Sequence, residues 1–169
     1  SVAAPTAGLH FSESLLKNLD AADIKREYLT LHVGAGTFKP VSTEQIGDHR
    51  MHREMITVAR AAIRALLNKE QQPVFAVGTT SLRTLESLYW FGAKLLRNQN
   101  DALLEVNQWD PYGPLNENPV AASDAFQAIL KLMDAKGQEH ISGFTSLMIV
   151  PGYQFRMCQG LITNFHQPQ

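Results

Sequence analysis

Apolar residues recur in four places along the chain at the three- and four-residue spacing of a helix. Ser12 can cap a short helix in which Leu15, Leu16 and Leu19 share one face. The other predicted helices cover residues 59–69, 81–97 and 123–136, the last one capped by Ser123. Gly137 follows it, at the position where a left-handed residue commonly ends a helix.

Shorter apolar stretches predict strands between these helices. They cover residues 27–33, 52–58, 74–77, 144–150 and 157–162. Because strands and helices alternate, the pattern predicts an α/β fold in which a mixed, mostly parallel sheet is flanked by helices. Residues 98–122 have the least regular pattern, and the sequence contains no internal repeat.

Length and composition fit a single domain, because 44% of the 169 residues are hydrophobic and only 18% are charged. The formal net charge of −1 gives no overall attraction for nucleic acid, so an RNA partner would need a local patch. The single cysteine, Cys158, is expected to be an inert core residue in a reducing compartment. The sequence shows neither a signal peptide nor an apolar run long enough to span a membrane, so we expect a cytoplasmic protein.

The most informative stretch is the end of the strand predicted at 27–33. It runs into the turn Gly34-Ala35-Gly36, which Thr37, an aromatic residue and a proline follow closely. Two glycines around one small residue let the backbone turn tightly and approach a ligand closely. We therefore expect a binding site here, with His32 beside the turn.

A second candidate is the segment 77–81, Val-Gly-Thr-Thr-Ser, where a predicted strand passes into a predicted helix. Free backbone N–H groups and hydroxyls at a helix N-terminus suit a carboxylate or a phosphate. The alternative is ordinary helix capping by Thr79 or Thr80.

Arg83 and Glu86 lie three residues apart on one face of the same predicted helix. Arg83 could hold a carboxylate or phosphate through two hydrogen bonds, and Glu86 could bind a ribose diol. The alternative is an exposed ion pair between the two, which would contribute little to stability.

Residues 48–54 contain two histidines, two arginines and two carboxylates. His49 and His52 could supply a base with a pKa near neutrality, or two ligands of a metal. The metal interpretation has neither the helical i, i+4 spacing nor an evident third ligand. A further alternative is a solvated edge strand without a chemical role.

Aromatic and histidine residues mark two further loops. His10 and His166 each lie beside a phenylalanine, and together with His32 they favour a shared pocket, although one such histidine alone is usually structural. Tyr153 and Phe155 could stack on a base or face a cation, or they could belong to the core.

Six segments, taken together and in this order, resemble one family: residues 4–11, 31–38, 48–52, 77–86, 151–155 and 163–166. They include Ala-Pro-Thr-Ala-Gly-Leu-His-Phe, Leu-His-Val-Gly-Ala-Gly-Thr-Phe and Thr-Asn-Phe-His. The family is the S-adenosylmethionine:tRNA ribosyltransferase-isomerases of queuosine biosynthesis. The resemblance implies that residues 1–169 form one α/β domain, a fragment of a larger, partly barrel-like main domain, without the family's small β-barrel insert. Residues 97–142 match little and are expected to vary.

The resemblance also implies a reaction. The ribosyl moiety of S-adenosylmethionine is transferred and isomerised onto 7-aminomethyl-7-deazaguanine in tRNA with a GUN anticodon, giving epoxyqueuosine-tRNA, adenine and methionine. S-adenosylmethionine would be the co-substrate, no metal would be needed, and we expect a monomer without membrane contact. A sulfonium acidifies the adjacent ribose carbon, so a neutral histidine would be a suitable base.

Under this interpretation we expect the site residues to converge on one cleft. The expected catalytic residues are His49, His52, His10 and His166, with His49 or His52 as the base. The expected cofactor-binding residues are Thr6, His32, Gly34, Gly36, Thr37, Thr79, Thr80, Arg83, Glu86, Tyr153, Asn164 and Phe165. Two alternatives stay open: a non-catalytic RNA- or nucleotide-binding lobe of the family, inactive as an isolated fragment, and a histidine-metal hydrolase built on His49 and His52.

Overall fold

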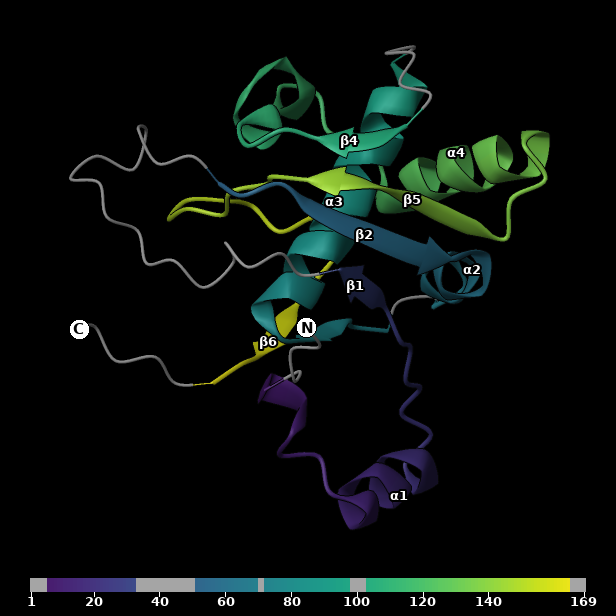
Figure 1. The fold of residues 1–169 in the computed structure, drawn as a ribbon, viewed down its shortest axis with the longest axis vertical. Coiled ribbons are helices and arrows are strands. Elements are labelled where there is room, and N and C mark those ends of the chain that lie inside the picture. The colour runs from purple at the N-terminus through teal and green to yellow at the C-terminus, as the bar shows by residue number, and fades with distance from the viewer. Residues whose placement is uncertain (1–5, 33–50, 70–71, 98–102, 165–169) are drawn as a thin grey trace.

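A computed structural model of the chain describes residues 6–32, 51–69, 72–97 and 103–164 and has an α/β fold (Figure 1). The helices are α1 (Glu13–Ala21), α2 (Arg60–Leu67), α3 (Thr79–Leu96) and α4 (Ala122–Ala135), and 3-10 turns cover Thr6–Gly8, Asp110–Tyr112 and Pro114–Asn116. The strands are β1 (Thr30–His32), β2 (Glu54–Ala59), β3 (Phe75–Val77), β4 (Leu104–Val106), β5 (His140–Thr145) and β6 (Gly160–Ile162). The expected α/β class is confirmed.

The strands form two sheets. One has the order β1-β2-β5-β4, and the other consists of β3 and β6. β2 runs antiparallel to both of its neighbours, whereas the β4–β5 and β3–β6 pairs are parallel. The expected mixed pairing is therefore confirmed, but parallel pairing does not predominate among the described strands, because two of these four ladders are antiparallel.

Local sequence signals correctly predict the start of α1 and the end of α4. The Ser12 hydroxyl accepts a hydrogen bond from the Leu15 N–H at 3.3 Å and so caps α1, as expected. Gly137 has a φ of +60° directly after α4, which is the left-handed conformation expected at a helix end. Ser123, however, does not cap α4: the helix begins at Ala122, after an N-cap alanine that makes no side-chain hydrogen bond.

The prediction of a strand at 144–150 is wrong. The observed strand β5 ends at Thr145, and the apolar residues that follow form a buried loop in which Leu147 has no exposed surface. An unbroken apolar run indicates burial but does not distinguish a strand from a buried loop.

Helix α3 is the centre of the hydrophobic core and crosses one face of the four-stranded sheet (Figure 1). Tyr89, Trp90 and Phe91 on this helix are almost completely buried. Helix α4 crosses it at Gly92, where a Cβ atom would lie 2.3 Å from the Ala125 carbonyl oxygen, so a residue without a side chain is needed. In the described ranges, no helix combines the length and the apolar character that crossing a bilayer requires.

Candidate functional site

Several strand ends meet at one edge of the four-stranded sheet, on the left of Figure 1. His32 at the end of β1 pairs with Met55 near the start of β2. Thr145 at the end of β5 pairs with Glu54 on one side and with Val106, the last residue of β4, on the other. The loops that follow β1, β4 and β5 therefore begin close together, beside the start of β2, which is a common location for a binding site in an α/β fold.

The two-stranded sheet brings a second set of ends to the N-terminus of α3. Val77 pairs with Ile162, and the Gly78 N–H donates a hydrogen bond to the Ile162 carbonyl at 2.8 Å. The 3-10 turn Thr6–Gly8 lies against the same point, because a Cβ atom on Gly78 would lie 3.8 Å from the Ala7 Cβ. The structure thus brings together three of the expected segments, those around Thr6, Thr79 and Asn164.

The N-terminus of α3 is capped by glycine rather than by threonine. Gly78 is the N-cap residue, with a φ of +92° that favours glycine, and no side chain caps the helix there. Thr79 is exposed, and the Thr80 carbonyl accepts a hydrogen bond from the Thr84 hydroxyl at 2.9 Å. The alternative of capping by Thr79 or Thr80 is therefore wrong. The first turn combines two nearby hydroxyls with backbone N–H groups that no described side chain caps, which suits an anion.

Arg83 lies one turn further along α3. Its Nη1 donates to the Glu54 carboxylate at 2.8 Å, and its Nε donates to the Leu147 carbonyl at 3.1 Å. Only 12% of the side chain is exposed, and the buried Nη2 has no hydrogen-bond partner among the described residues. Burial lowers the pKa of Arg83, and the negative charge of Glu54 opposes that shift. Arg83 therefore joins the start of β2 to the loop after β5, and its Nη2 is left without an acceptor from the part of the chain that the structure describes.

Glu86 lies at the next turn of α3 and is completely buried. Its Oε2 accepts hydrogen bonds from the Tyr153 hydroxyl at 2.8 Å and from the Arg156 N–H at 2.9 Å. Its Oε1 accepts from the N–H groups of Met157 and Cys158 at 2.9 and 3.0 Å. The alternative of an exposed ion pair between Arg83 and Glu86 is therefore wrong. Both carboxylate oxygens of Glu86 instead accept hydrogen bonds from the segment 153–158.

Tyr153 is fixed from two sides. Its hydroxyl donates to Glu86 and accepts a hydrogen bond from the Trp90 indole N–H at 2.7 Å. Burial, reinforced by the nearby Glu86 charge, raises the pKa of Tyr153 above its ordinary value. Tyr153 consequently remains a hydrogen-bond donor even at alkaline pH.

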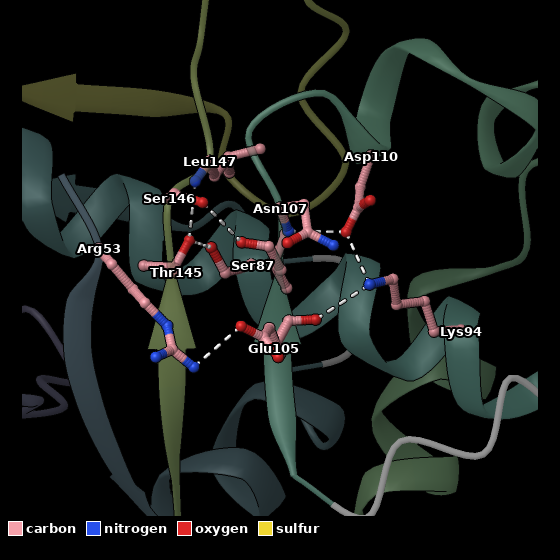
Figure 2. A network of polar contacts seen from close by, with 10 residues as sticks. Arg53, Ser87, Lys94, Glu105, Asn107, Asp110, Thr145, Ser146 and Leu147 are labelled. Atoms are coloured by element: carbon pink, nitrogen blue, oxygen red, sulfur yellow. Dashed lines mark hydrogen bonds and ion pairs between the residues drawn. The ribbon is translucent and has the colours of Figure 1, made fainter. Parts of the chain in front are cut away.

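Side chains from the middle and the last turn of α3 bind the C-terminal ends of β4 and β5 and the loop that follows β4 (Figure 2). The Ser87 hydroxyl lies 2.7 Å from the Thr145 hydroxyl, which also accepts from the Leu147 N–H at 3.1 Å. Lys94 donates to the Glu105 carbonyl at 3.1 Å and pairs with Asp110 at 2.7 Å. No sequence motif predicts the contacts of Ser87 and Lys94, because they join common polar residues that lie between 11 and 58 positions apart along the chain.

Cys158 is buried, as expected for a core residue. Burial, together with the charge of Glu86, raises the pKa of the Cys158 thiol to about 12. We expect a disulfide reagent at pH 8 to modify the native protein about a thousandfold more slowly than the urea-unfolded protein, because the thiolate is the reactive form. Comparable rates in the two states would contradict this.

The same shift predicts how stability depends on pH. The unfolded thiol releases its proton near pH 8.5, whereas the folded thiol holds it to about pH 12. Between these values the unfolded state binds fewer protons, so the contribution of Cys158 to stability is full below about pH 8.5 and falls as the pH rises.

Three of the expected histidines, His10, His32 and His52, are distributed over the two groups of strand ends. His52 is exposed and precedes β2 by two residues, and His32 ends β1, so both lie at the edge of the four-stranded sheet. His10 is exposed and lies close to the Thr6–Gly8 turn. The expected residues His49, His166, Gly34, Gly36, Thr37 and Phe165 lie outside the described residues. Within the described ranges, no group of three or more histidine, cysteine, aspartate or glutamate side chains could hold a metal ion.

Comparisons with known proteins agree on one family. The family model described as queuosine biosynthesis protein matches residues 1–169. A protein of Cupriavidus pinatubonensis named S-adenosylmethionine:tRNA ribosyltransferase-isomerase is 41% identical over 171 residues, and one of the same name from Legionella pneumophila (strain Corby) is 39% identical over 172 residues. Both alignments cover 100% of this chain but only 37% and 38% of those relatives. No solved structure matches the chain significantly.

Proposed function

Because the chain belongs to the family of queuosine biosynthesis proteins, we propose that the protein carrying it transfers and isomerises the ribosyl moiety of S-adenosylmethionine onto 7-aminomethyl-7-deazaguanine in tRNA with a GUN anticodon. The products are epoxyqueuosine-tRNA, adenine and methionine. The chain spans 37% of the length of the first of these relatives, so the whole activity is proposed rather than shown for it.

The observation that best supports the proposal is the buried Nη2 donor of Arg83, which finds no acceptor within residues 6–32, 51–69, 72–97 and 103–164. A buried donor without a partner costs about 1–3 kcal/mol, so Nη2 suits a ligand that supplies an acceptor. The open N-terminus of α3 lies one turn away and favours negative charge. We assign the carboxylate of S-adenosylmethionine to this place, between Thr79, Thr80 and Arg83.

We propose roles for the remaining expected residues from their positions in the chain and in the fold. His52, and His49 three residues earlier in the chain, would supply the base that removes a proton from the ribose carbon next to sulfur. His10 and His166 would shape the pocket, and the glycine turn at Gly34 and Gly36 would let the backbone approach the ligand. Glu86 and Tyr153 already form a hydrogen bond with each other. We therefore assign them the role of positioning the segment 153–158 rather than that of binding the ribose diol.

The function is tested by measuring free adenine after the protein is mixed with S-adenosylmethionine and a stem-loop RNA that carries 7-aminomethyl-7-deazaguanine. Replacing His49 or His52 with alanine should lower the turnover by about 100-fold or more, because a positioned base contributes at least that factor. His140→Ala is the matched control, because this exposed histidine pairs with Ala59 at the opposite end of β2 and should leave turnover unchanged.

Near-wild-type rates in both histidine variants would refute their assignment. If the wild-type protein binds S-adenosylmethionine and RNA but releases no adenine, the transfer reaction itself is refuted. The alternative of a non-catalytic binding lobe would then hold.

A further inference from the structure

Four aromatic side chains form a continuous row across the loops that follow β4 and β5. The ring centroids of Trp109 and Tyr112 lie 5.5 Å apart, those of Tyr112 and Tyr153 lie 6.1 Å apart, and those of Tyr153 and Phe155 lie 5.2 Å apart. We call these four residues the aromatic row. The two end residues are well exposed, Trp109 by 41% and Phe155 by 50%. The rings meet edge to face, so each contact covers one face of one ring, and the exposure of Trp109 and Phe155 leaves surface for a ligand at the two ends.

The middle of the row is held rigidly. The Tyr112 hydroxyl donates to the Met148 carbonyl at 3.0 Å and accepts from the Val150 N–H at 3.1 Å. Tyr153 is fixed by Glu86 and Trp90, as described above. Because both middle rings are anchored through their hydroxyls, binding a ligand to the row would not require these side chains to be ordered first.

Basic residues hold the same loop in place and add local positive charge. Arg97 donates to the carbonyls of Pro114 and Asn118 at 2.7 and 2.6 Å. The Arg156 guanidinium donates to the Asn116 side chain, and its Nε has no partner among the described residues. Because the formal net charge is −1, an RNA partner needs local cationic groups. Arg156, next to Phe155 in the chain, and Arg97, which binds the loop that carries Pro114, are two such groups. Lys94 pairs with the carboxylate of Asp110.

Trp109 also forms one wall of an open depression of about 530 Å³. Polar side chains from Asn107, Gln108, Asp110 and Ser146 line it, together with Pro114 and Leu115. Its volume is in the range of small-molecule sites. A flat ring beside amide, carboxyl and hydroxyl groups is the combination by which proteins stack an unpaired base and hydrogen-bond its edges.

We propose that the aromatic row and this depression bind unpaired bases of the RNA substrate, with Trp109 as the principal stacking surface. The proposal rests on the function proposed above in taking a structured RNA with a single-stranded loop as the partner. It adds a surface outside the Arg83 region and assigns it to the RNA rather than to S-adenosylmethionine.

The test uses the protein that carries this chain and an RNA stem-loop with 2-aminopurine in the loop. Stacking on Trp109 should quench the 2-aminopurine fluorescence, and Trp109→Ala should abolish the quenching and weaken binding about tenfold, as expected for the loss of one stacked base. Trp109→Phe should retain most of the affinity. Tyr28→Ala is the matched control, because Tyr28 is 76% exposed but lies outside the row.

A second variant, Phe155→Ala, shortens the exposed end of the row and should weaken binding of the same stem-loop while leaving binding of a blunt duplex unchanged. Unchanged stem-loop binding by both alanine variants would overturn the proposal and leave the row as a contact surface for protein. An equal loss with the duplex would also overturn it.

Adenine release separates this proposal from the function on which it rests. If wild-type protein releases adenine while the variants bind RNA normally, the RNA surface is refuted and the function stands. If the variants lose loop stacking but wild-type protein releases no adenine, the function is refuted and the surface stands.

Discussion

Replacing Glu86 with alanine is expected to lower the free energy of unfolding by about 3–5 kcal/mol. The substitution removes the acceptor of four hydrogen bonds at once, and three of the donors are backbone N–H groups that cannot turn elsewhere. Each unsatisfied buried donor costs about 1–3 kcal/mol, but local rearrangement and water entry keep the total below the sum. Equilibrium unfolding in urea measures the effect.

Two further variants make the Glu86 result specific. Glu86→Gln keeps the volume and one acceptor oxygen, so it should cost about half as much as alanine. Glu105→Gln is the control: its carboxylate pairs with Arg53 at 2.9 Å, but both side chains are about half exposed, so the loss should stay below about 1 kcal/mol. A cost for Glu86→Ala no greater than this control would show that the buried carboxylate does not hold the segment 153–158.

Most helices could be predicted from the sequence, because their signals are local. The cap at Ser12, the left-handed Gly137 and the long periodicity over α3 each depend on neighbouring residues only. The short strand β4 (Leu104–Val106) could not, because it lies within residues 98–122, where the hydrophobic pattern is least regular. Its pairing with β5 is decided by contacts with a distant part of the chain.

The sequence could suggest residues for a candidate site but not their contacts. Thr79, Arg83 and Glu86 lie on the helix that the pattern predicted, yet their spacing suggested that Arg83 and Glu86 face each other. In the structure Arg83 instead pairs with Glu54, 29 residues earlier, and Glu86 binds backbone groups near residue 157. Backbone donors have no sequence signature, so the role of Glu86 becomes visible only once the chain is folded.

The last prediction concerns Arg83, which the proposed function places on the carboxylate of S-adenosylmethionine. Arg83→Lys should lower kcat/KM for S-adenosylmethionine about a thousandfold, the equivalent of about 4 kcal/mol. Lysine keeps the charge but has one compact ammonium, which cannot donate to Glu54, to the Leu147 carbonyl and to a ligand in the fixed directions of a guanidinium. Initial rates of adenine release at varied S-adenosylmethionine measure the change.

The structural role of Arg83 has to be separated from its proposed role in binding. Lysine leaves a cation for the buried Glu54, so the folded state should survive, and unfolding in urea under the assay conditions establishes this. Arg64→Lys on the exposed side of α2 makes the same chemical change away from the site and should leave kcat/KM unaltered. If folded Arg83→Lys protein keeps kcat/KM within about tenfold of wild type, the buried Nη2 does not bind the co-substrate, because losing a buried charged hydrogen bond costs more than that factor.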